Sequence, residues 1–374
     1  MTINFKSNIR IFIFSFLILA LASAAVVFKS GLFFSEEPIY VALVHSTIDG
    51  QPAWDGLEEI SNTAQMYIDS IKGTVNGKPI ELLIFDDHAD ANMAKQVASE
   101  IVAQNKAIIV IGHLDSNACI AAGKIYKKAK IPVISPTCSA DAVTEGNKWY
   151  FRTIPSATYS GAFLANYVKK VMKHNNVSIV YDDQRANYAA TAESFQNSYQ
   201  GIKGKIKHKE IIHLQDDIDK RVEEVTQVFL LDKPDLIMLI THENITKKII
   251  VAMKRKEFAL PVFATILTLG SKFDEYFEEQ LTPGYFLDGV YTSSLLIFDI
   301  AGKGVQNVRN EYIAKYQQEP SWFMSSAYET TKIAIKAISE VGAKGRNLAK
   351  ERLDIRNYLA SKTSMKNNNN EYSQ

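Results

Sequence analysis

Short apolar runs alternate with helical stretches from Pro38 onward, and this alternation constrains the fold of the 374-residue chain more than any other feature. The run over 107–111 is apolar throughout, which is typical of strands covered on both faces of a parallel sheet. The runs interpreted as strands are 39–44, 80–85, 107–111, 131–134, 177–181, 236–240, 260–264 and 289–292. The segments with helical spacing are 57–71, 94–102, 117–128, 163–171, 189–199, 222–231, 305–316 and 323–341. This order predicts parallel sheets with helices on both faces.

The length of the chain suits two lobes better than one core. Pro155-Ser156 separates two series of alternating strands and helices, and it is the natural crossover between the lobes. We therefore expect an α/β fold of two doubly wound parallel-sheet lobes joined by a hinge. The expected division is 1–37 as a membrane segment and linker, 38–155 as lobe I, 156–287 as lobe II, 288–342 as a return to lobe I, and 343–374 as a C-terminal helix and disordered tail.

The N-terminus carries an uncharged apolar run over 11–28 that follows Lys6 and Arg10. A basic start, an apolar core and the small residues Ala22-Ser23-Ala24 are typical of a cleaved signal peptide. The length of the run also fits an uncleaved membrane anchor, which we favour. Both interpretations place the remaining chain outside the cytoplasm, because basic flanks stay inside. We expect an extracytoplasmic protein anchored to the cytoplasmic membrane by residues 11–28.

Charge and cysteine content exclude several classes of function. The formal net charge is +1, so no bulk charge favours nucleic acid as a partner. Cys119 and Cys138 are too few and too far apart for a zinc site, whereas an oxidising compartment permits a disulfide between them. No metal and no cofactor are expected.

Polar and aromatic residues follow several of the predicted strands, where ligands of open α/β sheets bind. The candidate ligand-binding residues are Trp54, Asp115, Ser116, Thr137, Ser139, Tyr188, His242 and Glu243. The helix that opens at Ser116 offers free N–H groups to a carboxylate or another acceptor. Structural roles stay open: Asp115 or Ser116 as an N-cap, Trp54 as core packing, and His242-Glu243 as an exposed pair.

Motifs of common catalytic sites are missing from the sequence. It contains no G-x-S-x-G elbow, no Gly-rich phosphate loop and no H-E-x-x-H motif. We therefore expect a binding protein and no catalytic residues. An enzyme built on two α/β lobes, or a ligand-free interaction or sensor domain, remains the alternative.

Several segments together resemble the type I periplasmic substrate-binding proteins, in the leucine/isoleucine/valine-binding branch of ABC uptake systems. They are GKPIELLIFDDHADANMAKQVASEIV, AIIVIGHLDS, IPVISPTCSA, FRTIPS, VSIVYDD, PDLIMLI, LDGVY and YIAKYQQEPSWFMSSAYETTKIAIKAI. The resemblance implies a small solute held between two lobes, for uptake through an ABC permease or for a membrane sensor. It implies that Ser116, Thr137 and Ser139 hold the ligand's carboxylate and neighbouring polar group.

The same resemblance assigns the remaining contacts. Trp54 would cover the ligand's side chain, while Tyr188 and His242 would approach from lobe II.

The sequence departs from this family at two places. Amino-acid binders of the family place a Glu after the strand at 260–264, whereas this chain has Thr265-Ile266-Leu267-Thr268. A buried ammonium needs a partner, so Glu243 or Asp115 would have to substitute. We therefore predict a carboxylate- or amide-bearing, amino-acid-like ligand with an apolar or aromatic part, favoured over a free aliphatic amino acid. The second departure is the C-terminus, which predicts an incomplete last crossover.

Overall fold

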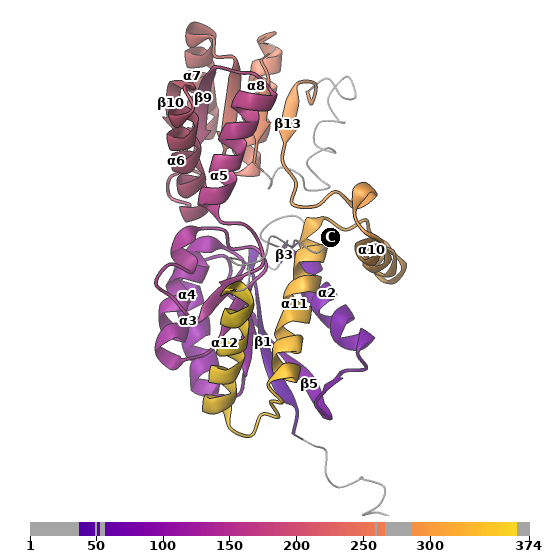
Figure 1. Cartoon of the computed structure of the whole chain (residues 1–374). Coiled ribbons are helices and arrows are strands. Elements are labelled where there is room, and N and C mark those ends of the chain that lie inside the picture. The colour runs from indigo at the N-terminus through magenta and orange to yellow at the C-terminus, as the bar shows by residue number, and fades with distance from the viewer. Residues whose placement is uncertain (1–36, 49–50, 53–56, 259, 266–285, 365–374) are drawn as a thin grey trace, which may run out of the picture. The chain divides into compact units, whose positions relative to one another are not determined.

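The computed structural model describes residues 37–48, 51–52, 57–258, 260–265 and 286–364 (Figure 1). The first sheet has the strand order β4-β5-β1-β6-β7-β8. Its strands are β1 (Ile39–His45), β4 (Thr74–Val75), β5 (Lys78–Asp86), β6 (Ile109–Ile111), β7 (Val133–Ser135) and β8 (Tyr150–Arg152). All pairs are parallel except β4 with β5, which form a hairpin around Asn76-Gly77. Parallel pairing aligns the carboxyl ends of these strands along one edge.

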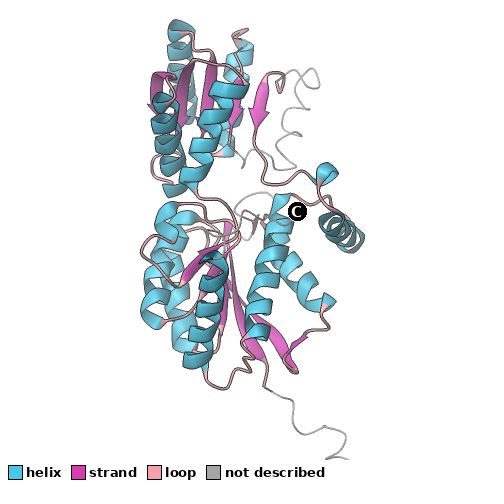
Figure 2. Ribbon diagram, in the orientation of Figure 1, coloured by secondary structure: helices cyan, strands magenta, loops and turns pink. Residues whose placement is uncertain are grey.

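Helices cover both faces of the first sheet (Figure 2). Val41 and Leu43 of β1 face one core, and Ala42 and Val44 face the other, as the two-residue period of a strand requires. The helices on the first face are α2 (Glu58–Ser70), α11 (Trp322–Glu340) and α12 (Leu348–Ser364). Those on the second face are α3 (Ala91–Gln104) and α4 (Ser116–Ala129). The first lobe is therefore doubly wound.

The second sheet is parallel throughout and has the order β10-β9-β11-β12-β13. Its strands are β9 (Asn176–Tyr181), β10 (Lys205–Ile211), β11 (Leu236–Ile240), β12 (Val262–Ala264) and β13 (Val290–Thr292). Helix α5 (Ala157–Asn166) and helix α6 (Ala186–Gly201) pack on one face. Helix α7 (Ile218–Asp232) and helix α8 (Glu243–Arg255) pack on the other. The predicted class, two doubly wound α/β lobes, is confirmed.

Shorter elements join these layers. They are the two-stranded pair β2 (Thr47–Ile48) and β3 (Gln51–Pro52), the 3₁₀ turns η1 (Asp141–Val143) and η4 (Phe298–Ile300), the π-helical turn η2 (Tyr167–Val171), and α10 (Lys303–Tyr316).

The structure differs from the sequence prediction in the second lobe. Strand β10 was not predicted, because its sequence KIKHKEI has no apolar run and alternates exposed with half-buried residues at a sheet edge. Strand β13 pairs with β12, so the chain leaves the second sheet after residue 292, beyond the boundary expected at 288. The described residues beyond β13 form helices and add no strand. The incomplete last crossover stays a prediction.

The predicted membrane segment over 11–28 and the predicted tail over 365–374 lie outside the described residues. Within the described ranges, no helix is both long enough and apolar enough to cross a bilayer.

Glu59 of α2 is a buried carboxylate at the start of α11. It accepts hydrogen bonds from the Ser321 amide at 2.9 and 3.0 Å, the Ser321 hydroxyl at 3.0 Å and the Met324 amide at 3.0 Å. Burial raises the pKa of Glu59 from 4.5 to about 7, against the opposing effect of these donors. Glu59 thus fixes the beginning of α11 against α2.

A disulfide joins Cys119 of α4 to Cys138 in the loop after β7. The Cα atoms are 6.6 Å apart, and both side chains are fully buried. Two hydrogen bonds reinforce this link: Thr137 Oγ1 donates to the Leu114 carbonyl at 2.7 Å, and the Ala140 amide donates to Ser116 Oγ at 3.3 Å. The first turn of α4 and the loop after β7 are therefore held as one unit.

Removing the disulfide should destabilise the chain. The cysteines are separated by 19 positions in the sequence, so the Cys119→Ala/Cys138→Ala variant should lose about 3 kcal/mol of unfolding free energy, since the unfolded chain gains freedom. Urea unfolding of the oxidised chain and the variant measures the loss. Free thiols in the denatured, unreduced chain, or equal stabilities, would contradict the expectation.

Glu59 should make stability depend on pH in a defined direction. The folded state holds the Glu59 proton up to about pH 7, while the unfolded chain releases it near pH 4.5, so the unfolding free energy falls as the pH rises between these values. Between pH 5 and 7.5, the wild type should lose about 1 to 3 kcal/mol relative to Glu59→Gln. Urea titrations at several pH values measure the difference, and Glu58→Gln at the exposed neighbouring position is the matched control. Parallel pH profiles for wild type and Glu59→Gln would show that the raised pKa is not real.

Candidate functional site

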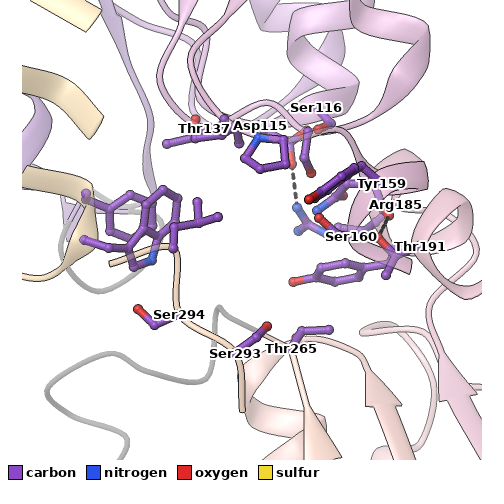
Figure 3. Close-up of a pocket in the computed structure, with 18 of the residues that line it drawn as sticks. Asp115, Ser116, Thr137, Tyr159, Ser160, Arg185, Thr191, Thr265, Ser293 and Ser294 are labelled. Atoms are coloured by element: carbon purple, nitrogen blue, oxygen red, sulfur yellow. Dashed lines mark hydrogen bonds and ion pairs between the residues drawn. The ribbon is translucent and has the colours of Figure 1, made fainter. Parts of the chain in front are cut away.

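A cavity of about 270 Å³ lies at the carboxyl ends of strands from both sheets (Figure 3). Its lining from the first lobe consists of Leu57, Leu114, Asp115, Ser116, Thr137, Ser139, Ile154, Pro155, Trp322 and Phe323. Its lining from the second lobe and from the segment after β13 consists of Tyr159, Ser160, Phe163, Leu164, Arg185, Asn187, Tyr188, Thr191, Thr265, Ser293, Ser294 and Leu295. Aromatic rings, aliphatic side chains and hydroxyl groups therefore dominate the wall.

The first-lobe wall brings together the residues that the sequence placed after two neighbouring strands. Asp115 and Ser116 follow β6, while Thr137 and Ser139 follow β7. Strands β6 and β7 are paired in parallel, so their loops leave the sheet side by side. The structure thus places these four candidates at one cavity, and their role in binding stays a prediction.

The N-terminus of α4 differs from the expectation of free N–H groups. Asp115 is its N-cap, and its side chain accepts hydrogen bonds from the amides of Asn117 at 2.9 Å and Ala118 at 3.2 Å. Two of the donors expected for a ligand carboxylate are thus satisfied by the protein. The alternative interpretation of Asp115 as an N-cap is confirmed.

Two helices of the second lobe supply the opposite wall. Gly161 allows α5 to approach α6 closely, since a Cβ there would lie 2.5 Å from the Thr191 carbonyl oxygen. This packing sets Tyr159 and Phe163 of α5 beside Tyr188 of α6 at the cavity. Tyr188 was predicted at the site, and the structure places it there with 3% of its surface exposed.

Arg185 is a lining residue that the sequence interpretation missed. Its guanidinium Nη1 lies 2.8 Å from Oδ2 of Asp115, so the two residues form an ion pair between the lobes. Figure 3 shows this contact at the cavity wall. Burial raises the pKa of Asp115, and Arg185 partly offsets that effect. Arg185 lies in the loop after β9. Tyr188 was selected because it follows the same strand, so the same reasoning could have found Arg185.

The sequence analysis also missed Trp322 and Phe323, which line the cavity. They begin α11 and do not follow a strand, so the search of loops after strands could not find them. Glu59 positions them, because it holds the backbone where α11 starts.

His242 and Glu243 do not line the cavity. His242 is the N-cap of α8, and its Nδ1 accepts a hydrogen bond from the Asn244 amide at 3.3 Å. Burial lowers the pKa of His242 to about 4, with further contributions from Arg185 and Lys247. Glu243 forms an ion pair with Lys247 one turn along α8. Their expected contact with a ligand therefore has no support in the geometry.

Trp54, the remaining candidate, lies outside the described residues.

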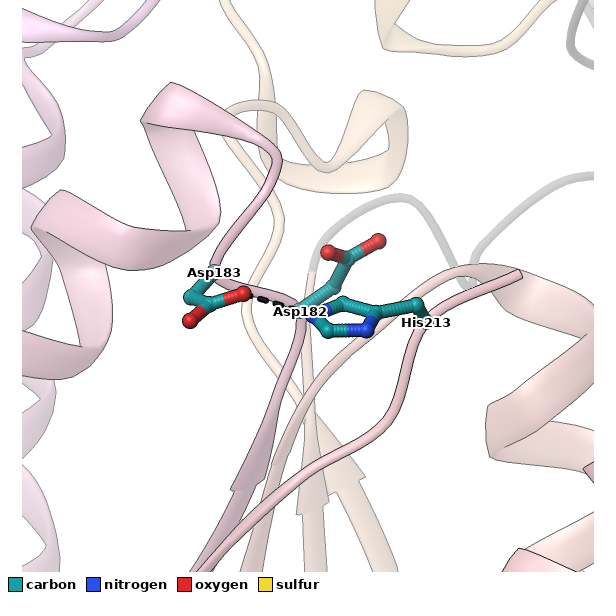
Figure 4. A group of neighbouring side chains, drawn as sticks. All are labelled: Asp182, Asp183 and His213. Carbon is teal, nitrogen blue, oxygen red and sulfur yellow. Dashed lines mark hydrogen bonds and ion pairs between the residues drawn. The ribbon is translucent and has the colours of Figure 1, made fainter. Parts of the chain in front are cut away.

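Asp182, Asp183 and His213 form a polar group near the ends of β9 and β10 (Figure 4). Their potential metal-ligating atoms lie within 4.8 Å of one another. His213 Nε2 is 2.6 Å from Asp183 Oδ1, and this bond raises the pKa of His213. Asp182 accepts a hydrogen bond from the Gln184 amide at 2.9 Å. Protein partners account for the arrangement, which by itself does not indicate a metal ion.

Comparison with known proteins agrees with this architecture. An amino acid binding protein of Pseudomonas aeruginosa is 30% identical over 191 residues, which are 50% of each chain. A Leu/Ile/Val-binding protein of Escherichia coli is 32% identical over 152 residues, which are 40% of this chain and 41% of the relative. The aligned regions thus span about half the length of these curated relatives, or less.

Fold similarity extends over most of the chain. The crystal structure of a leucine binding protein from Thermotoga maritima superposes with a TM-score of 0.74 at 19% identity, covering 85% of this chain and 87% of the other. The sequence model of the periplasmic binding protein family matches residues 38–357. The chain therefore belongs to the periplasmic binding protein family.

Proposed function

We propose that this chain captures a small solute in its cavity, outside the cytoplasm, and delivers it to an ABC-type uptake system. The observation that carries the proposal is a single cavity lined by strand-end residues of both lobes. Ligands of open α/β sheets bind at this edge, and a site shared by two lobes can enclose a small molecule.

The cavity suits a ligand with an apolar body and a polar end. Its volume of about 270 Å³ is close to the lower limit for small-molecule sites, which suits a compound of amino-acid size. Phe163, Trp322 and Phe323 offer aromatic surface, while Ser139 and Ser160 bring hydroxyl groups into the same space. These contacts support an amino-acid-like ligand with a carboxylate or amide group, and the names of the two curated relatives point to the same chemistry.

The lining supports binding without turnover. The described residues of the cavity wall include no His, Cys or Lys, so none of the usual pairs of a nucleophile and a nitrogen base lies there. A transporter partner and membrane attachment through residues 11–28 complete the proposal.

A ligand should stabilise the chain, and a side chain that fills the cavity should abolish the effect. A compound at about 100 times its Kd adds roughly 2.7 kcal/mol to the unfolding free energy, so a thermal-shift screen of amino acids, carboxylates and amides should find one. Ser293→Trp places an indole in the cavity and should remove the shift.

Ser99→Trp is the matched control, because Ser99 is exposed on α3. It should keep the shift. No stabilising compound, or an equal shift in Ser293→Trp, would contradict the proposed site. Chemical change of the recovered ligand would contradict the assignment as a binding protein.

A further inference from the structure

The edge of the first sheet opposite the cavity carries a local excess of positive charge. It is formed by segments that lead into strands or follow helices of lobe I, namely 72–78, 103–108, 127–132, 144–149 and 340–352. These segments hold eleven Lys or Arg residues and three Glu, whereas the whole chain has 42 Lys or Arg and 41 Asp or Glu. We call this surface the basic edge.

Sheet pairing and two side chains bring these segments together. Strands β1, β5, β6, β7 and β8 pair in parallel, so the segments before them share the edge at which the strands begin. Asn76 Nδ2 donates to the carbonyls of Ile338 at 3.1 Å and Ala343 at 2.8 Å. Arg352 donates to the Ala107 carbonyl at 2.7 and 3.0 Å. The loop between α11 and α12 therefore lies at the end of lobe I where β1 starts (Figure 1).

Six cations of the basic edge are exposed: Lys106, Lys128, Lys130, Lys148, Lys344 and Arg346. None of these six side chains forms an ion pair with a carboxylate in the part of the chain that the structure describes. Of the three Glu residues, Glu351 accepts the backbone amides of Lys344 at 3.1 Å and Gly345 at 2.9 Å. The ammonium and guanidinium groups are thus available to an external anionic surface.

Helix ends account for part of this charge. Lys127 and Lys128 lie in the last turn of α4, where the free carbonyl groups favour cations. The corresponding edge of lobe II has exposed cations in similar places, at Lys173, Lys203, Lys205 and Lys233. Charge alone therefore does not distinguish the two edges as a docking surface.

The path of the chain distinguishes them. Ile39 begins β1 at the basic edge, so the chain enters lobe I there. Ten residues, 29–38, connect β1 to the membrane segment proposed at 11–28. A segment of ten residues spans at most about 35 Å when fully extended. Attachment through 11–28 thus holds the start of β1 within this distance of the end of the membrane segment.

We propose that the basic edge of lobe I docks on an anionic phospholipid surface beside the membrane segment, so that the cavity at the opposite edge of the sheet faces away from the lipid. Each Lys or Arg close to an anionic membrane strengthens binding roughly 5-fold. The inference rests on the membrane attachment within the proposed function, and it adds a specific surface and a lipid charge.

Fluorescence quenching on the full chain tests the proposal. The chain is incorporated into vesicles of phosphatidylcholine, with or without a third of the lipid replaced by phosphatidylglycerol, and a lipid with a nitroxide headgroup is the quencher. A fluorophore on Ala103→Cys, exposed near the end of α3, reports on the basic edge. A fluorophore on Gln200→Cys, exposed near the end of α6, reports on the corresponding edge of lobe II.

The label at position 103 should be quenched at least about 3-fold more strongly than the label at position 200 in vesicles with phosphatidylglycerol, and high salt should remove the difference by screening. The combined substitutions Lys106→Gln, Lys130→Gln, Lys148→Gln and Lys344→Gln should reduce quenching at position 103 to its value in phosphatidylcholine.

The matched control removes four cations from lobe II instead, through Lys173→Gln, Lys203→Gln, Lys205→Gln and Lys233→Gln. It should leave quenching at position 103 unchanged. Equal melting temperatures of both fourfold variants and the wild type establish that the fold is retained, and a destabilised variant is replaced by its four single substitutions.

The outcomes separate this inference from the proposed function. Equal quenching in the two kinds of vesicle, equal quenching of the two labels, or an equal loss in both fourfold variants overturns the inference and leaves solute binding intact. Flotation with phosphatidylcholine vesicles tests the membrane segment separately. If the chain does not float with them, attachment through 11–28 is contradicted, and the inference then stands only if the chain floats with anionic vesicles and the lobe I variant does not.

Discussion

Parallel pairing of β1 with β5 and β6 is the constraint on which the first lobe, and half of the cavity, depends. Because Val41 and Leu43 face one core and Ala42 and Val44 the other, a shift of β1 by one residue would place each set in the core that is packed around the other set. Because this register is fixed and the pairing is parallel, the loops after β6 and β7 leave the sheet at the same edge. In the second sheet, β9, β11 and β12 pair in parallel in the same way, so Arg185 after β9 and Thr265 after β12 reach the same cavity.

The sequence predicted the central strands because their burial leaves continuous apolar runs, as in Leu236–Ile240. Strand β10 escaped prediction because an edge strand keeps charged residues such as Lys207 and Lys209 at its surface. The sheet that β13 joins could not be predicted for a related reason: β13 is an edge strand of three half-buried or exposed residues, and nothing in its sequence indicates which sheet it joins.

The search of residues that follow predicted strands located the first-lobe wall and Tyr188, because the position of these loops depends only on sheet topology. It did not separate Glu243, whose side chain bonds along α8, from residues that face the cavity. It also overlooked Arg185, whose long side chain reaches across to Asp115. Trp322 and Phe323 could not be found this way, since the packing of α11 against α2, with Glu59 at its start, brings them to the site.

Rigidity beneath the wall is as relevant to binding as the lining itself. The Cys119–Cys138 disulfide and the bond from Thr137 to the Leu114 carbonyl order two loops before any ligand arrives. A preformed wall lowers the conformational entropy that binding would otherwise cost. The ion pair of Asp115 and Arg185 in this wall is also held in place by the fold, because Asn117 bonds the backbone on both sides of Arg185.

A crystal structure of the full chain grown with leucine or phenylalanine tests the central claim most directly. The account predicts the amino acid in the cavity, in contact with lining residues of both lobes such as Ser139 and Phe163. An amino acid bound elsewhere on the chain would contradict the account.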